Sequence, residues 1–197
     1  MPRLRKYDES EVLDKSMALF WEKGFLGTSL KDLEKKLNLK APSIYHAYGN
    51  KESLFLKVIE HYLQKVVNER IEIYFNKGSN PIENIKSFFL SLVEHSSSVN
   101  ARNGCLLTNT ATEVGSTNPE ISSRVQLGID KINESILLEL EKAQKNGELK
   151  ADVNIKIMAT MLSLGYQGLL VSLRLNYSKE TLLQKTLSVL KILDLKT

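Results

Sequence analysis

Cysteine and histidine are common nucleophiles and metal ligands in proteins, and this sequence contains few of them. Its 197 residues include one cysteine, Cys105, and three histidines, His46, His61 and His95. The histidines are far apart and lack the spacing of a metal-ligand motif. The HExxH, GxSxG, P-loop and GxGxxG motifs of common enzymes are also missing. We therefore predict no catalytic residue, no metal site and no cofactor.

Cys105 is the one reactive candidate. It opens a predicted helix over residues 104–115, in the sequence GCLLTNTATEVG. A helix N-terminus favours the thiolate form of a cysteine, which is the reactive form. The alternative role is that of a small buried apolar side chain. A single cysteine excludes an intrachain disulfide, which is typical of a reducing cytoplasm.

The most ordered pattern of the chain extends from Thr28 to Leu54 and predicts two short helices followed by a third. Leucines at positions 30, 33 and 37 share one face of the first helix. Pro42 lies near the first position of the second, where its missing N–H costs nothing. Gly49-Asn50 ends that helix, and Asn50 caps a third that begins at Lys51. Two helices across such a tight turn form a helix-turn-helix, whose second helix can enter a DNA major groove.

The second helix of this motif is expected to carry the DNA contacts. Its apolar side is formed by Ile44, Tyr45 and Tyr48. The hydroxyl of Tyr45 is expected to hold a phosphate, together with Thr28, which we expect to cap the first helix, and Lys51. Base edges would be contacted by the residues that face away from the apolar side. The predicted DNA-binding residues are Thr28, Lys40, Ala41, Pro42, Ser43, Tyr45, His46 and Lys51.

Residues 11–55 resemble the DNA-binding domain of the tetracycline-repressor (TetR) family. The matching residues are Ala18, Leu19, Phe20, Gly24, Phe25, Thr28, Ser29, Leu33, Leu39, Ile44, Tyr45, Tyr48, Lys51, Glu52 and Leu54. The resemblance implies an all-α homodimer, with a three-helix DNA-binding domain and a larger helical domain for a small molecule and the second subunit. Two positions depart from the family pattern. Lys40 replaces a Ser or Thr cap, which weakens the start of the recognition helix, and Ala47 replaces a larger polar residue.

The resemblance also bears on Cys105. Some members of the family that sense electrophiles or oxidants carry a cysteine in a similar Gly-Cys-Leu sequence, which implies a sensing role. Members without that role carry Gly-Cys there too, so both readings stay open.

Length allows one large or two small domains, and the resemblance implies two. The chain carries a net charge of +4 and 42% hydrophobic residues, which allows a sizeable core but does not by itself identify a nucleic-acid binder. We expect a helix-turn-helix domain over 1–50 and a ligand-binding and dimerisation domain over 51–197, with about nine helices in all. No signal sequence or stretch of ~18–20 apolar residues is expected, so we predict a cytoplasmic protein without membrane contact. The basic arm 2–6 is either solvated or a further DNA contact.

Apolar spacing predicts the remaining helices over 8–23, 51–76, 82–97, 120–145, 152–173 and 179–193. The helix over 51–76 would join the two domains, with a buried stripe that includes Val66 and Ile73. The last two helices carry more apolar residues than one helix pair needs. We interpret them as a homodimer face that forms a four-helix bundle across a twofold axis, the alternative being an ordinary intrachain core.

A pocket for a small, largely apolar or electrophilic inducer is expected in the second domain. Aromatic walls with a few polar groups are typical of such pockets, although for any single position plain core packing is the favoured reading. The candidate lining residues are Tyr62, Phe89, Leu92, Cys105, Thr108, Asn109, Thr112, Tyr166 and Gln167.

These patterns favour a ligand- or electrophile-responsive repressor that binds a palindromic double-stranded operator. Two alternatives stay open. One is a cytoplasmic helical ligand-binding protein or small enzyme without specific DNA binding. The other is a DNA-binding activator or structural organiser of DNA.

Overall fold

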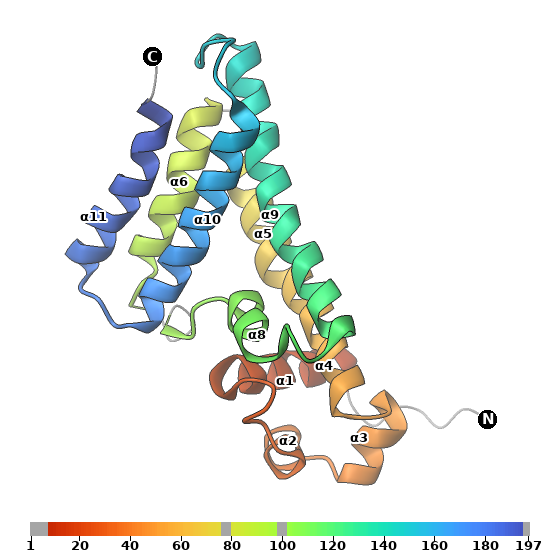
Figure 1. The fold of residues 1–197 in the computed structure, drawn as a ribbon. Coiled ribbons are helices and arrows are strands. Elements are labelled where there is room, and N and C mark those ends of the chain that lie inside the picture. The colour runs from red at the N-terminus through yellow and green to blue at the C-terminus, as the bar shows by residue number, and fades with distance from the viewer. Residues whose placement is uncertain (1–7, 76–79, 98–101, 195–197) are drawn as a thin grey trace.

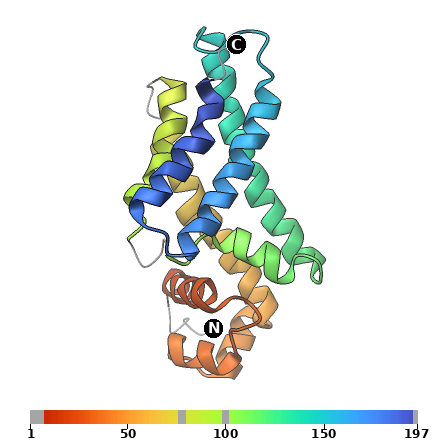
Figure 2. The ribbon, with the colours of Figure 1, turned by 60° about the vertical axis from the view of Figure 1, so that its left-hand side comes forward.

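The computed structural model describes residues 8–75, 80–97 and 102–194, and within these ranges every regular element is a helix (Figure 1). This confirms the predicted all-α fold. The predicted basic arm over 2–6 lies outside the described residues. Three helices form a head at one end of the molecule, and the other helices form a body above it (Figure 2).

The head contains α1 (Glu9–Lys23), α2 (Leu30–Leu37) and α3 (Ala41–Tyr48), which pack around apolar side chains from each helix. Phe20, Leu33 and Ile44 are almost completely buried. Phe55 from the next helix closes this core, with its ring centroid 4.8 Å from that of Phe20. The predicted helix-turn-helix is therefore present, and its apolar faces point inward.

Two helix starts in the head differ from the sequence prediction. Ser29, not Thr28, caps α2: its side chain accepts from the Asp32 N–H while the Asp32 carboxylate accepts from the Ser29 N–H, a reciprocal capping box. At α3, Lys40 makes no side-chain cap, as its residue type predicts. The Glu34 carboxylate of α2 instead accepts the Ala41 N–H at 2.7 Å, which supplies the missing cap from the neighbouring helix.

The predicted helix over 51–76 is a rod of three segments that runs from the head into the body (Figure 1). These are α4 (Lys51–Tyr62), the π-helical η1 (Leu63–Asn68) and α5 (Glu69–Phe75). A π-helical segment changes the angular register of the residues that follow it. Accordingly Val67 is buried where α-helical spacing predicted Val66, and Ile73, predicted as buried, is 42% exposed.

The body contains α6 (Pro81–Glu94), α8 (Leu106–Val114), α9 (Pro119–Lys145), α10 (Ile155–Arg174), α11 (Lys179–Leu190) and the 3₁₀ turn η2 (Lys191–Asp194). Asparagine caps three of its helices, because the side chains of Asn80, Asn118 and Asn154 accept N–H groups in the first turns of α6, α9 and α10. The start of α10 was therefore predicted too early, at Asp152.

Among the described residues, α10 is long and apolar enough to cross a membrane by length and composition alone. The prediction that no stretch approaches these limits was wrong for this helix. Buried helices of globular cores share this composition, and one side of α10, with Met158, Leu162 and Tyr166, is buried against the bundle. Close packing against α11 depends on Gly165, where a Cβ atom would lie 2.5 Å from Val189.

Candidate functional site

The solvent-facing side of α3 is small, polar and basic. Lys40, Pro42, Ser43 and His46 are exposed, and Ala41 is half-buried. Tyr45 was predicted both on the apolar side and as a phosphate contact; it is 46% exposed, so it belongs to the outer face. Small residues at the start of a helix, followed by polar and aromatic side chains, suit insertion into a major groove.

Two predicted phosphate contacts lie beneath this face. Thr28 is fully buried, and its hydroxyl donates to the Gly24 carbonyl at 2.7 Å, so this side chain is engaged within the head and its contact with DNA stays a prediction. The Lys51 ammonium donates to the carbonyls of Phe25 and Thr28 at 2.9 and 3.1 Å. It also lies 4.4 Å from the centre of the Phe25 ring. Both side chains thus fix the loop between α1 and α2, and a phosphate contact by Lys51 stays a prediction.

A cavity of about 420 Å³ lies between the head and the body, and helix α1 of the head forms part of its wall. Four of the nine predicted ligand-binding residues line it: Tyr62, Leu92, Cys105 and Tyr166. Its volume is within the range of about 300–1,000 Å³ that is typical of small-molecule sites. The other lining residues are Met17, Trp21, Lys65, Val66, Val67, Arg70, Phe88, Ser91, His95, Gly104, Ile132, Leu170 and Leu173.

The other five predicted residues do not line this cavity. Phe89 is completely buried and packs edge-on against Tyr166, with ring centroids 5.4 Å apart. Thr108 donates its hydroxyl to the side-chain oxygen of Gln167. The Nε2 group of Gln167 is buried and has no partner among the described residues. Asn109 donates to the Asn103 carbonyl at 2.8 Å. Thr112 is exposed and bonds carbonyls of its own helix. A helix presents several faces, and sequence spacing alone did not identify which face of α8 or α10 meets the cavity.

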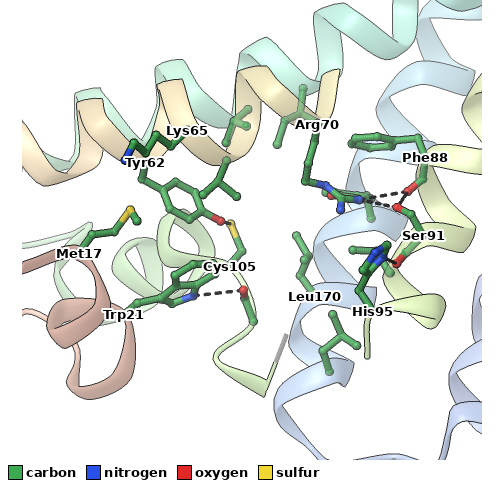
Figure 3. A pocket seen from close by; sticks show the side chains of 17 residues that line it. Met17, Trp21, Tyr62, Lys65, Arg70, Phe88, Ser91, His95, Cys105 and Leu170 are labelled. Carbon is green, nitrogen blue, oxygen red and sulfur yellow. Dashed lines mark hydrogen bonds between the residues drawn. The ribbon is translucent and has the colours of Figure 1, made fainter. Parts of the chain in front are cut away.

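Cys105 lies at one end of the cavity, beside two aromatic residues (Figure 3). The thiol is 3% exposed, and the Tyr62 hydroxyl donates to its sulfur at 3.6 Å. Burial, together with the neighbouring thiol, raises the pKa of Tyr62 well above its usual value, so this phenol stays a donor at neutral pH. Trp21 packs edge-on against Tyr62 at 5.1 Å and donates its indole N–H to the Gly104 carbonyl at 3.2 Å.

The opposite end of the cavity is polar and was missed in the sequence. There Arg70, Ser91 and His95 gather, as Figure 3 shows. Arg70 donates to the Ser91 hydroxyl at 2.7 Å and to the Phe88 carbonyl at 3.3 Å. The Nδ1 atom of His95 lies 2.8 Å from the Ser91 carbonyl. Arg70 lies four residues after Val66, so α-helical spacing places it beside the predicted buried stripe. Its charge gave no reason to expect an inward position, because arginine is seldom buried.

Helix α8 connects the cavity to the head at both of its ends. At its start, the Gly104 carbonyl accepts the indole N–H of Trp21 from α1. Near its end, the Glu113 carboxylate accepts the backbone N–H groups of Phe25 and Leu26 at 2.9 and 2.8 Å. The Lys51 ammonium donates to carbonyls of the same loop. Any shift of α8 therefore acts directly on the head.

Helices α10 and α11 leave an apolar surface uncovered, which we call the α10–α11 stripe: Ile157, Met161, Leu164, Val171, Leu175, Tyr177 and Leu187, each between 42% and 68% exposed. Other apolar residues at the C-terminal end of the chain are buried in the body: Leu169, Leu170, Leu173, Leu182, Leu190 and Leu193. One side of these helices therefore forms intrachain core, and the other remains open; that the open side is a homodimer face stays a prediction.

Comparison with known proteins places these features in a family. A family model described as bacterial regulatory proteins, tetR family, matches residues 12–58, and one described as tetracyclin repressor-like, C-terminal domain, matches residues 81–187. The chain is 26% identical to the HTH-type transcriptional repressor ComR of Escherichia coli K12, over 92% of this chain and 87% of ComR. It is 30% identical to the uncharacterized HTH-type transcriptional regulator YezE of Bacillus subtilis, over 83% and 84%.

A solved structure of similar fold is that of a cysteine mutant of the TetR family transcriptional regulator CifR, complexed with 26-bp double-strand operator DNA. It superimposes with a TM-score of 0.87 at 24% identity, over 96% of this chain and 98% of that chain. The matches cover both the head and the body. The protein therefore belongs to the TetR family of bacterial transcriptional regulators, with a helix-turn-helix head and a helical body.

Proposed function

We propose that this protein represses transcription by binding a palindromic DNA operator as a homodimer, and that a small molecule in the cavity releases it. The observation that carries the proposal is the outward face of α3. Its small and polar residues are exposed while Ile44 and Tyr48 anchor the helix in the head. The names of two similar proteins support it, since ComR is called a repressor and CifR was solved with operator DNA.

Residues 1–50 form the DNA-binding domain and residues 51–197 the ligand-binding and dimerisation domain in this proposal. The α10–α11 stripe would pack on the same stripe of a second chain about a twofold axis, because exposed apolar surface of this extent favours an isologous interface. Two α3 helices would then read successive major grooves about 34–36 Å apart. The protein acts in the cytoplasm, where it reaches the chromosome.

Release requires a ligand that binds the DNA-free conformation more tightly than the DNA-bound one. The cavity is suited to this role because Met17 and Trp21 of the head helix α1 line it together with residues of the body. A ligand that displaces Trp21 or the start of α8 would reposition the head through Gly104 and Glu113. Coupling of this kind is worth about 1–3 kcal/mol in typical allosteric proteins.

Fluorescence anisotropy with a labelled duplex from the promoter region beside its own gene tests the DNA-binding part. We expect tight binding that weakens steeply as salt rises, because phosphate contacts release counterions, and a preference over random duplex of the same length. Equal affinity for both duplexes would contradict specific operator binding and favour a ligand-binding protein or small enzyme.

Cys105 gives a second test of the same site, because a covalent adduct on its sulfur would fill one end of the cavity. We expect alkylation of the wild-type protein to weaken operator binding and alkylation of Cys105→Ser to leave it unchanged. Unchanged operator affinity after complete modification of Cys105 would remove the thiol from the sensing mechanism and leave it as a buried apolar residue.

A further inference from the structure

The charge of Arg70 has no counter-ion in the described part of the chain. Its guanidinium is charged at any physiological pH. No carboxylate among the described residues lies within 4 Å of it, whereas the other cation of the rod at the cavity, Lys65, pairs with Asp14 at 2.7 Å. No Asp or Glu is among the residues that line the cavity. The cavity therefore carries an uncompensated positive charge.

Arg70 is held in place but not saturated. One terminal nitrogen, Nη2, donates both to the Ser91 hydroxyl and to the Phe88 carbonyl. The Nε–H of Arg70 is buried and has no partner. The guanidinium lies 5.2 Å from the ring centre of Phe88 and 5.6 Å from that of Tyr74, so aromatic faces fix its plane. A merely structural arginine would be expected to satisfy its buried donors, because each unmade bond is costly.

We propose that the cavity binds an amphipathic carboxylate, with the acid group on Arg70 and the apolar body toward Cys105; this inference rests on the proposed ligand-binding function. The planar fork of the guanidinium matches the two oxygens of a carboxylate. The guanidinium is half-buried, so part of the cost of desolvating it is already met before an anion binds. Ser91 and His95 add polar groups at the same end of the cavity.

The rest of the cavity sets the chemistry of the ligand body. Its other end is formed by Trp21, Tyr62 and Cys105, and Leu170 and Ile132 contribute apolar side chains to its lining. The Tyr166 phenol is neutral at physiological pH, since burial raises its pKa although the Arg70 charge opposes the rise, so Tyr166 supplies no anion to the guanidinium. An aliphatic or aromatic chain fits these walls, whereas a cationic ligand would meet the charge of Arg70.

The experiment uses the intrinsic fluorescence of Trp21, the only tryptophan in the chain, which lies in the cavity wall. Full-length protein is titrated with hexanoate, octanoate, decanoate and phenylacetate, and with octanamide and octylammonium as neutral and cationic counterparts of octanoate. Calorimetry confirms each affinity. We expect at least one carboxylate to bind, and octanoate to bind at least tenfold more tightly than octanamide and octylammonium.

Two variants assign the preference to one side chain. Arg70→Met removes the charge at similar length, and Arg124→Met removes an exposed arginine on α9 that pairs with Glu60 outside the cavity. We expect Arg70→Met to abolish the acid-over-amide preference and Arg124→Met to keep it. Because the ligand series on wild-type protein needs no substitution, the test survives if Arg70→Met does not fold.

Absence of binding by every carboxylate, equal binding of acid and amide, or an unchanged preference in Arg70→Met would each overturn the inference. Operator affinity is measured separately in the same samples. Carboxylate binding without release of operator would contradict the proposed induction mechanism and leave the anion site standing. Specific operator binding without carboxylate binding would overturn the anion site and leave the proposed DNA-binding function standing.

Discussion

At the scale of single residues, two charged side chains and one buried hydroxyl hold the loop between α1 and α2. Lys51 donates to its carbonyls, Glu113 accepts its N–H groups, and the buried Thr28 hydroxyl closes it internally. Hydrogen bonds to charged groups are stronger than neutral ones. The position of α2 and α3 relative to the body therefore depends on a few side chains that do not touch DNA in the proposed complex.

Substitution of Lys51 by Gln should lower the free energy of unfolding by about 1–2 kcal/mol, because two carbonyls lose a charged donor. Urea denaturation measures this change. Lys57→Gln is the matched control, since Lys57 is an exposed lysine of the same helix. Equal stability of the two variants would show that the bonds of Lys51 contribute nothing.

On the outer face of α3, His46 and Tyr45 should have different roles. His46→Ala is expected to change the preference among operator sequences, because a base contact discriminates between base pairs. The discrimination lost at the affected position should be about 1–3 kcal/mol. Tyr45→Phe should weaken specific and random duplexes alike, because a phosphate contact carries no sequence information. Anisotropy titrations with both duplexes distinguish these outcomes, and uniform loss in both variants would refute the division of roles.

At the scale of elements, α8 is the shortest α-helix that the structure describes in the body, but it bridges two parts of the molecule. It begins at the cavity with Cys105 as its N-cap, and Glu113 near its end holds the head. The rod has a comparable role, because its π-helical segment contributes Lys65, Val66 and Val67 to the cavity wall. In each of these two elements, one end lies at the cavity and the other end contacts the head.

Glu113→Ala should weaken the coupling between the cavity and the operator. This substitution removes the hydrogen bonds from the backbone N–H groups of Phe25 and Leu26. We expect the ligand-induced drop in operator affinity to shrink at least fivefold, which corresponds to about 1 kcal/mol of coupling. Operator titrations with and without a bound carboxylate measure it. Glu120→Ala, in the exposed first turn of α9, is the control. Full coupling in Glu113→Ala would exclude the α8 route.

At the scale of the whole molecule, the α10–α11 stripe is the largest apolar feature that the described chain leaves open along one helix pair. Leu164 lies within it and is 68% exposed. A Cβ atom added to Gly168 would meet no neighbouring atom within 4 Å, so this side of α10 is also open to close approach by another chain.

Leu164→Glu should convert the dimer to a monomer, because each subunit would bury an unpaired charge in the isologous contact. Sedimentation equilibrium measures the mass, and operator affinity should fall with it. Leu138→Glu is the matched control, since Leu138 is 56% exposed on α9, outside the stripe. A dimer that survives Leu164→Glu but not Leu138→Glu would place the interface on α9.

The amino-acid sequence by itself determined the helices, the helix-turn-helix and the family. These follow from local physics: leucine spacing, asparagine caps, and Gly24 and Gly49 at positive φ where helices end. The exposed residues of α3 were also predictable, because a short helix with two buried positions, Ile44 and Tyr48, leaves its other face to solvent.

Only the tertiary structure decided which faces of the longer helices meet. Long-range contacts buried Thr28, engaged Lys51 and replaced the missing cap of α3 with Glu34 from α2. The π-helical segment shifted the register of the rod, and no periodicity in the sequence marks that shift. Arg70 lines a cavity for which other lining residues were predicted, because the position of a charge relative to distant helices is a property of the packed chain.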